Sequence, residues 1–401
     1  MHCSGGKTMK KRILSLVLAL CMVFSVSAVA FAQEAPVLKF DENGEFKILH
    51  VCDCQDGYPA NQKMFDYLDT VLKVYQPDLV ILGGDNTVGE EKTKELAVEE
   101  LVKPFVDNKV PFTLVFGNHD HQQGYNNDEL FEMYKRYGGE YCLAYDAVPE
   151  LHGTATHNLP VYASKSDDIK FNLWMFDSGT YVKDENGNDL GYECVTEDQI
   201  KWYKDTSNAL AQQAGGKVPS LAFQHIIVGD VYDALFAESP IALGAVTREF
   251  NGKIYSFFPK LHNFSGFLLE YPCPGVYNFG QFDAMVEQGD VLGIFSGHDH
   301  VNDFETEIDG VKIINTPSAS AESYRAAVNN GARLITVKED DAWNFTSEVI
   351  TYNDLVIENE DFAAKTGASK ASAMLMNFLG DFALVLTKLA AVFSRIIFLG
   401  K

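Results

Sequence analysis

The chain has 401 residues, of which 46% are hydrophobic and 12% aromatic, and its formal net charge is −24. This composition can fill a large core and excludes a disordered or collagen-like protein. Such a negative charge repels nucleic-acid backbones at long range, so nucleic acid is not expected as the main partner.

The first 32 residues have the pattern of a cleavable secretory signal. Residues 10–12 are basic, residues 13–30 form an apolar run, and residues 30–32 match the small-residue cleavage site. A retained transmembrane anchor is the alternative, because the run approaches spanning length. We therefore expect a signal peptide at 1–32, a domain at 36–355, and a protein that is secreted or held at the cell surface.

Apolar runs alternate with amphipathic stretches through the first half of the domain. The runs 48–51, 78–82 and 112–116 are predicted as buried strands, and the stretches 61–75 and 91–108 as helices. This alternation of strand and helix is typical of an α/β fold with parallel strands.

Polar residues follow these three strands directly. They are Asp53, then Asp85 after two glycines, then Asn118 with His119 next to it. Ligands in open α/β sheets bind beyond the carboxyl ends of the strands, so these side chains are expected to converge on one point.

Two strands in the second half also end at histidines. The run 221–223 leads to His225, and the run 291–295 leads to His298 and His300. The remaining predicted elements are strands at 171–176, 304–307, 311–315, 333–337 and 345–352 and a helix at 197–213.

The C-terminal part is predicted as a polar linker, 356–373, followed by an amphipathic helix, 374–401. Asp381, Lys388 and Arg395 recur every seven residues, which places them on one helical face and argues against a clean membrane span. The helix can either dock on the protein's own surface or lie in a membrane interface. The linker before it favours peripheral membrane association.

Taken singly, each polar motif is typical of an ordinary turn or of a core histidine. Together, five such groups at five strand ends indicate phosphoryl chemistry with two metal ions. A carboxylate can bridge two cations, while imidazole nitrogens and an amide oxygen complete each coordination sphere.

These blocks resemble the calcineurin-like metallophosphoesterase superfamily, whose motifs run D-x-H, G-D-x-x, G-N-H-D/E, H and G-H-x-H. The resemblance covers residues 45–355, and the stretches 176–179, 196–203 and 297–304 are similar to the branch of the Dcr2 phosphatase and the purple-acid-phosphatase-like proteins. It implies a four-layer α/β/β/α sandwich with two mixed β-sheets.

The resemblance also implies a role for each motif residue. One metal ion would be held by Asp53, Asp85 and His300, and the other by Asp85, Asn118, His225 and His298. The ions would be divalent or trivalent: manganese, iron or zinc. A bridging hydroxide would attack the phosphorus, His119 would bind phosphate and protonate the leaving oxygen, and Asn118 and His121 would also contact substrate.

Two positions depart from the family pattern. Gln55 stands where the first motif has a histidine, and an amide oxygen is a weaker ligand than imidazole for zinc or iron. Val88 occupies the position of the tyrosine that gives purple acid phosphatases their colour, so that chromophore is not expected.

The sequence thus predicts a secreted phosphoesterase acting on the monoester of a phosphorylated small molecule or phosphoprotein. A phosphodiesterase acting on nucleotides or lipid headgroups is the first alternative, because segments 121–165 and 228–285 decide specificity and carry no clear pattern. A non-catalytic protein that binds phosphate or metal through a site weakened at Gln55 is the second.

Overall fold

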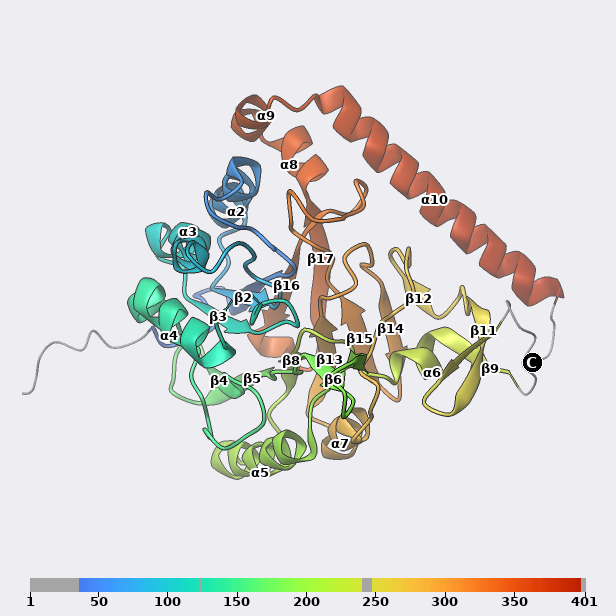
Figure 1. The fold of residues 1–401 in the computed structure, drawn as a ribbon, viewed down its shortest axis with the longest axis horizontal. Helices are drawn as coiled ribbons and strands as arrows, with labels where there is room; N and C mark the ends of the chain where they lie inside the picture. Colours follow the sequence, from blue (N-terminus) through green and yellow to red (C-terminus); the bar gives the residue numbers. More distant parts are fainter. Residues whose placement is uncertain (1–35, 123, 240–246, 398–401) are drawn as a thin grey trace, which may run out of the picture. The chain divides into compact units, whose positions relative to one another are not determined.

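The protein is described by a computed structural model that covers residues 36–122, 124–239 and 247–397. Two β-sheets pack face to face, and helices lie on their outer faces (Figure 1). The predicted four-layer α/β/β/α sandwich is confirmed, and both of its sheets are mixed.

The first sheet has five strands in the order β17-β16-β1-β2-β3. Strands β1, β2 and β3 are parallel, whereas β16 pairs antiparallel with both of its neighbours, β1 and β17. Their bounds are β1 Glu45–Val51, β2 Leu79–Gly83, β3 Phe112–Val115, β16 Gly331–Lys338 and β17 Phe345–Thr351.

The second sheet has seven strands in the order β12-β14-β15-β13-β8-β5-β4. Its central strands β15, β13, β8 and β5 are parallel, and the outer pairs β12–β14, β14–β15 and β4–β5 are antiparallel. The bounds are β4 His157–Tyr162, β5 Ile169–Met175, β8 Ser220–Phe223, β12 Phe264–Ser265, β13 Val291–Ser296, β14 Glu305–Ile308 and β15 Val311–Asn315.

Continuous apolar strands suit this layered arrangement, because successive side chains point to opposite faces of a sheet. In β1, Ile48 joins the cluster between the two sheets, while Leu49 and Val51 join the cluster beneath the outer helices. In β2, Ile81 and Leu82 divide in the same way. Both faces of the strands are therefore buried, which explains why the runs show no polar alternation.

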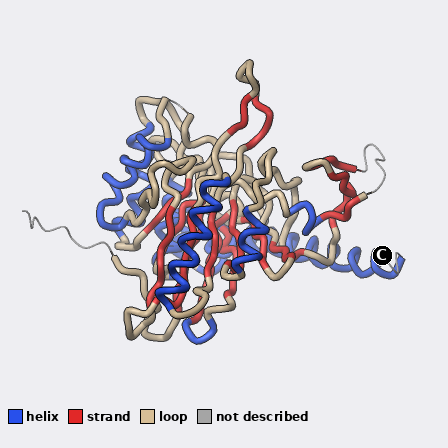
Figure 2. Tube along the Cα trace, turned by 90° about the horizontal axis from the view of Figure 1, so that it is seen from below, coloured by secondary structure: helices blue, strands red, loops and turns tan. Residues whose placement is uncertain are grey.

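Helices cover both outer faces, and Figure 2 shows two of them lying across the near side of the strands. The helices over the first sheet are α2 Gln62–Tyr75, α3 Lys94–Asp107, α4 Asn127–Gly138, α8 Tyr352–Glu358 and α9 Glu360–Thr366. Those over the second sheet are α5 Glu197–Ala214, α6 Val231–Leu235 and α7 Gln281–Gln288.

The segments without a clear sequence pattern contain small elements of their own. They are the hairpin of β6 Tyr181–Lys183 and β7 Asp189–Tyr192, the sheet of β9 Phe236–Glu238, β10 Thr247–Phe250 and β11 Lys253–Pro259, and 3₁₀ turns at Gly139–Tyr141 and Glu339–Asp341. The β6–β7 hairpin contributes directly to the site described below.

The prediction of a polar linker at 356–373 is wrong, because most of this segment is helical. Phe362 of α9 is fully buried between Tyr67 of α2 and Tyr352 of α8, with ring centroids 6.5 and 6.2 Å away. Asn359 caps α9 by accepting a hydrogen bond from the Phe362 amide. The last helix, α10, begins at Lys370 and not at 374, and it ends at Ile397; residues 398–401 of the predicted helix lie outside the described residues.

Candidate metal centre

Five strands from the two sheets end at one place. Strands β1, β2 and β3 lead to Asp53, Asp85 and Asn118, and the neighbouring strands β8 and β13 lead to the histidines. Hydrogen bonds hold the segments after these strands together: the His298 amide donates to the Asp53 side chain at Oδ2, 3.0 Å away, and the Ser318 amide donates to the His300 carbonyl at 2.9 Å. The predicted convergence of the polar clusters is present in the structure.

The backbone is strained where these side chains leave their strands. Asp53, Gln55, Asp85 and His298 have φ values of 51°, 41°, 50° and 71°, in the left-handed region that side chains disfavour. Each such residue costs on the order of 1 kcal/mol, and such costs gather at functional sites.

Two glycines allow the strand ends to approach one another closely. A Cβ on Gly84 would lie 2.7 Å from the Cβ of His225, and a Cβ on Gly117 would lie 2.8 Å from the carboxyl carbon of Asp85. Real Cβ atoms do not come this close. The glycines before the motif residues are therefore required by packing.

His225 is fully buried, and its ring is oriented by the backbone. Nδ1 donates to the Gly83 carbonyl at 2.9 Å, which leaves Nε2 as the free nitrogen, 3.4 Å from Asp85 Oδ2 and 3.9 Å from Asp53 Oδ1. A backbone carbonyl that fixes the tautomer in this way is typical of metal-binding histidines.

His300 is held in the same manner. Its Nδ1 donates to the Tyr324 carbonyl at 2.9 Å, and its Nε2 lies 3.3 Å from Asp53 Oδ1. The imidazole also stacks on the Tyr324 ring, with centroids 4.0 Å apart and planes 4° from parallel. His298 packs edge-to-face between Tyr192 and His225, with centroids 4.3 and 5.1 Å away.

Asn118 is oriented by a residue that the motif analysis missed. Its amide nitrogen donates to the Tyr181 hydroxyl at 2.7 Å, so its carbonyl oxygen is the atom left over. That oxygen is buried and has no hydrogen-bond partner among the described residues.

The donor atoms fit a metal ion. Asp53 Oδ1, Asn118 Oδ1 and His225 Nε2 are buried and have no hydrogen-bond partner among the described residues, although such unsatisfied buried polar atoms are rare and costly. Ligand atoms of Asp53, Asp85 and His225 all lie within 4.8 Å of one another. Carboxylate, amide oxygen and imidazole together suit manganese, iron or zinc.

The buried carboxylates of the site favour a positive charge close to them. Burial alone would lower the pKa of His225, but the Asp85 carboxylate outweighs it and raises the pKa to about 10. Burial would raise the pKa of Asp85, yet His225 holds it below its usual value. The pKa of His298 falls to about 3 through burial and the nearby His225. A cation at this point would satisfy both carboxylates and leave the imidazoles neutral, as metal binding requires.

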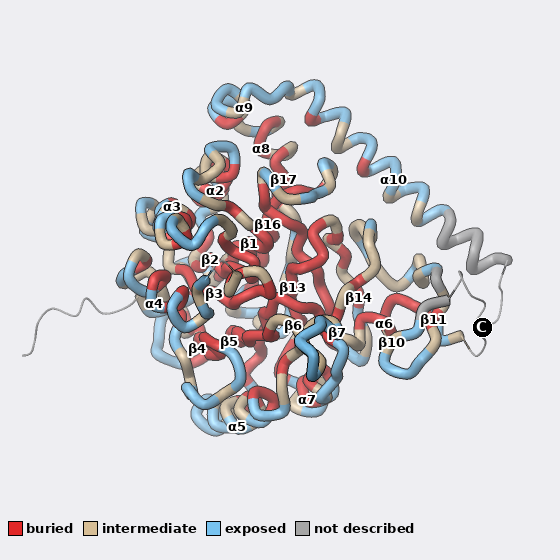
Figure 3. The backbone as a smooth tube through the Cα atoms, in the orientation of Figure 1, coloured by how far each residue is buried: buried red, intermediate tan, exposed pale blue. Residues whose placement is uncertain are grey.

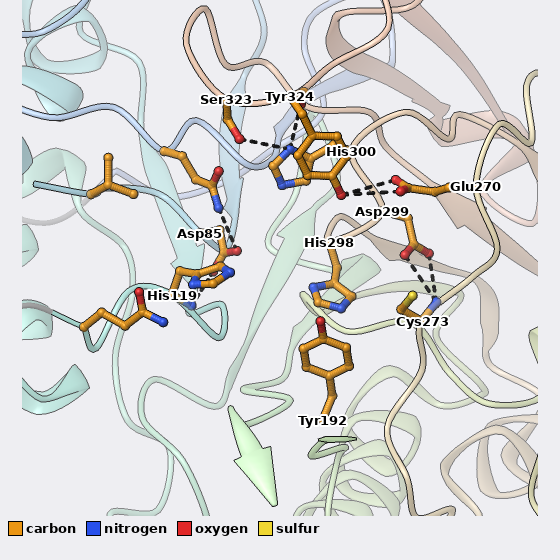
Figure 4. Close-up of a pocket in the computed structure, with 13 residues that line it drawn as sticks. Asp85, His119, Tyr192, Glu270, Cys273, His298, Asp299, His300, Ser323 and Tyr324 are labelled. Carbon is orange, nitrogen blue, oxygen red and sulfur yellow. Dashed lines mark hydrogen bonds between the residues drawn. The ribbon is translucent and has the colours of Figure 1, made fainter. Parts of the chain in front are cut away.

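A cavity of about 390 Å³ opens onto this cluster (Figure 4). Asp85, His119, His298 and His300 line it, whereas the fully buried Asp53, Asn118 and His225 do not. The amide of His119 donates to Asp85 Oδ1 at 2.7 Å.

Gln55 also lines this cavity, and its side-chain amide nitrogen donates to Asp85 Oδ2 at 3.2 Å. It therefore reaches the carboxylate that is expected to bridge two ions. His121, for which a substrate contact is predicted, is not among the residues that line the cavity. A tight turn, in which the Gln122 amide donates to the His119 carbonyl, brings Gln122 to the wall instead.

Several other residues of the cavity carried no sequence signal. Tyr192, Glu270 and Tyr324 are isolated residues in loops or in a short hairpin, and only the fold brings them together. The Tyr324 hydroxyl lies 3.4 Å from Glu270 Oε1 on the cavity wall. The guanidinium of the next residue, Arg325, donates to the Ser323 carbonyl.

Comparison with known proteins agrees with this site. A family model described as calcineurin-like phosphoesterase matches residues 46–302. That match covers more than half of the chain, which therefore belongs to the calcineurin-like phosphoesterase family.

The chain is similar to two proteins of Arabidopsis thaliana called probable inactive purple acid phosphatases 14 and 29. It is 25% identical to the first over 356 residues, which cover 79% of this chain and 82% of that protein. Identity to the second is 24%, with 79% and 84% covered.

Phosphatase DCR2 of Saccharomyces cerevisiae is 24% identical over 47% of this chain and 36% of its own length. Among solved structures, a dimetal phosphatase from Danio rerio aligns with a TM-score of 0.45 at 11% identity, covering 76% of this chain and 98% of that one.

Proposed function

We propose that this protein hydrolyses phosphate esters with two metal ions held by the strand-end residues. The observation that carries the proposal is the set of buried ligand atoms on Asp53, Asn118 and His225, which have no hydrogen-bond partner among the described residues and lie next to an open cavity. The full proposed ligand set is Asp53, Gln55, Asp85, Asn118, His225, His298 and His300.

Two bound metal ions would supply a nucleophilic water at neutral pH and neutralise the charge of the phosphoryl group. The chain's own residues prepare this chemistry. Gly83 and Tyr324 fix the free nitrogens of His225 and His300, and Tyr181 fixes the oxygen of Asn118. Positioned ligands of this kind lower the reorganisation needed during reaction.

His119 is the proposed proton donor to the leaving oxygen. Its backbone is tied to Asp85, so its position follows that of the metal site, while its ring lies on the cavity wall, partly exposed. A general acid must lie within reach of the substrate without being consumed as a ligand, and His119 meets this condition.

Gln55 affects which metal ion is bound. An amide oxygen in place of imidazole shifts preference toward manganese, which favours oxygen ligands, and away from zinc. We therefore propose manganese as the ion that best restores activity.

Phosphomonoester hydrolysis is the leading activity, and one observation supports a second candidate. Among the described residues that line the cavity there is no lysine or arginine, and Glu270 contributes a carboxylate. The cavity wall therefore offers no cationic side chain to stabilise a dianionic monoester. A diester carries one negative charge fewer and needs less of this stabilisation. Diester hydrolysis is accordingly the second candidate.

A non-catalytic role is the alternative from a different class, and the names of the Arabidopsis relatives raise it. The motif residues Asp85, Asn118, His119, His298 and His300 are all present, which supports catalysis. Gln55 replaces the histidine of the first family motif, which supports a site without activity. We also propose that the protein is secreted and that its substrate is a phosphorylated small molecule or phosphoprotein. The N-terminal pattern alone supports secretion.

The test is hydrolysis of an aryl phosphate monoester and diester by metal-stripped protein before and after addition of manganese, zinc or iron. The proposal expects metal-dependent turnover that Asp85→Asn abolishes, and the ratio of the two rates decides between monoester and diester. Metal binding without turnover on either substrate would establish the non-catalytic alternative.

A further inference from the structure

Helix α10 packs on the domain through its smaller and more polar side. Asn377 donates to Asp354 Oδ1 of α8 at 2.8 Å, and Ala373 is buried. Gly380 is also buried, so close to the domain that an added Cβ would lie 3.4 Å from the Phe267 ring and 3.6 Å from Val328. These residues follow helical spacing and define the inward face.

Figure 3 shows that most residues in the described part of α10 are exposed, and many of them are large and apolar. Phe378 is 63% exposed and Phe382 52% exposed, and their rings stack with centroids 6.4 Å apart. This outward apolar face consists of Met374, Leu375, Phe378, Leu379, Phe382, Val385, Leu386 and Leu389, all exposed. A helix that only covered its own domain would turn these side chains inward.

We propose that the outward apolar face of α10 binds a lipid surface, with the helix lying in the membrane interface. The face spans about 140° of the helix at 100° per residue. This width is typical of interfacial helices. The face runs over the 16 residues from Met374 to Leu389, about 24 Å of helix, which gives an extended line of contact.

A second copy of the chain fits this face less well than lipid does. Coiled-coil partners use a narrow seam of about two positions in seven, whereas this face uses about four. Two copies would also bring together chains that each carry a net charge of −24, which opposes association. A zwitterionic lipid surface presents no such repulsion.

The contacts of α10 also define its orientation in the membrane. The stretch Lys370–Leu389 is long and apolar enough to cross a bilayer by length and composition. However, Asn377 and Gly380 hold the helix along the domain, and Asp381 and Lys388 are exposed. A helix fixed along the domain surface presents one side to lipid, as an interfacial helix does.

The experiment is sedimentation of the chain from residue 33 onward with phosphatidylcholine vesicles. This chain omits the predicted signal, whose apolar run would bind lipid by itself, and retains the compact unit Pro36–Lys401. The variant Phe378→Glu/Phe382→Glu changes two exposed side chains, so folding is expected to persist. The control, Val74→Glu/Leu96→Glu, changes two exposed apolar residues on α2 and α3 that are 48% and 37% exposed.

We expect the parent chain and the control to sediment with vesicles at both low and high salt, and the Phe378/Phe382 variant to bind about 100-fold more weakly. Equal binding of all three proteins, or no binding by the parent, would overturn the proposal. So would binding restricted to anionic vesicles and lost in high salt. A dimer that forms without vesicles and is lost in the Phe378/Phe382 variant would assign the face to a second copy.

Discussion

Gly117→Ala tests whether catalysis depends on the position of Asp85. Gly117 needs no unusual φ, so alanine is compatible with its backbone. The new methyl group would overlap the Asp85 amide nitrogen and Oδ1 and would lie 2.8 Å from the carboxyl carbon. Relief of that contact requires a displacement of about 1 Å, since carbon atoms pack at about 3.5–4.0 Å.

Two effects of different size follow from this displacement. Overpacking of this kind costs about 1–3 kcal/mol of stability. A shift of about 1 Å in a catalytic group costs about 10²-fold in rate. Turnover is therefore expected to fall by about 10²-fold in a protein that remains folded.

The assay combines thermal unfolding, metal content and steady-state turnover on the preferred aryl phosphate ester. Gly216→Ala is the matched control, because a Cβ there meets nothing within 4 Å and the position follows α5, remote in sequence from every proposed ligand. A folded Gly117→Ala protein with wild-type turnover would refute the reasoning that this glycine positions Asp85.

Three further variants separate the roles of neighbouring residues. His119→Ala should keep its metal ions yet lose about 10²–10⁴-fold in turnover, as expected for a proton donor; metal loss without a separate kinetic effect would make His119 a ligand. Gln55→His should tighten zinc binding, measured by competition with a chelating dye, because imidazole suits zinc better than an amide does; unchanged affinity would place Gln55 outside the ligand set. Tyr181→Phe removes the hydroxyl that orients Asn118 and should weaken metal binding about 10–100-fold; full affinity in this variant would show that Asn118 needs no such support.

The sequence predicts the central fold well because buried parallel strands have a strong local signal. The runs 48–51, 78–82 and 112–116 match β1, β2 and β3, and each ends next to a polar motif. The failure at 356–373 has a physical reason. Residues 358–361 before Phe362 are all polar, and the burial of Phe362 depends on contacts with Tyr67 of α2 and Tyr352 of α8.

The proposed metal ligands were predictable, whereas their supports were not. Asp53, Asp85 and His225 lie at strand ends within recognisable motifs. Tyr181 and Tyr324 orient Asn118 and His300 from a short hairpin and a loop, with no local pattern to mark them. Long-range packing alone places these two side chains, so only a structure can reveal them.

The most direct test of the metal centre is anomalous diffraction from crystals of metal-stripped protein soaked in manganese, collected alongside the metal titration of activity. The account predicts two anomalous peaks per chain that share Asp85 as a ligand, with the other proposed ligands completing the coordination: Asp53, Gln55, Asn118, His225, His298 and His300. It also predicts that turnover rises as both positions fill. Peaks elsewhere on the acidic surface, with none at Asp85, would contradict it.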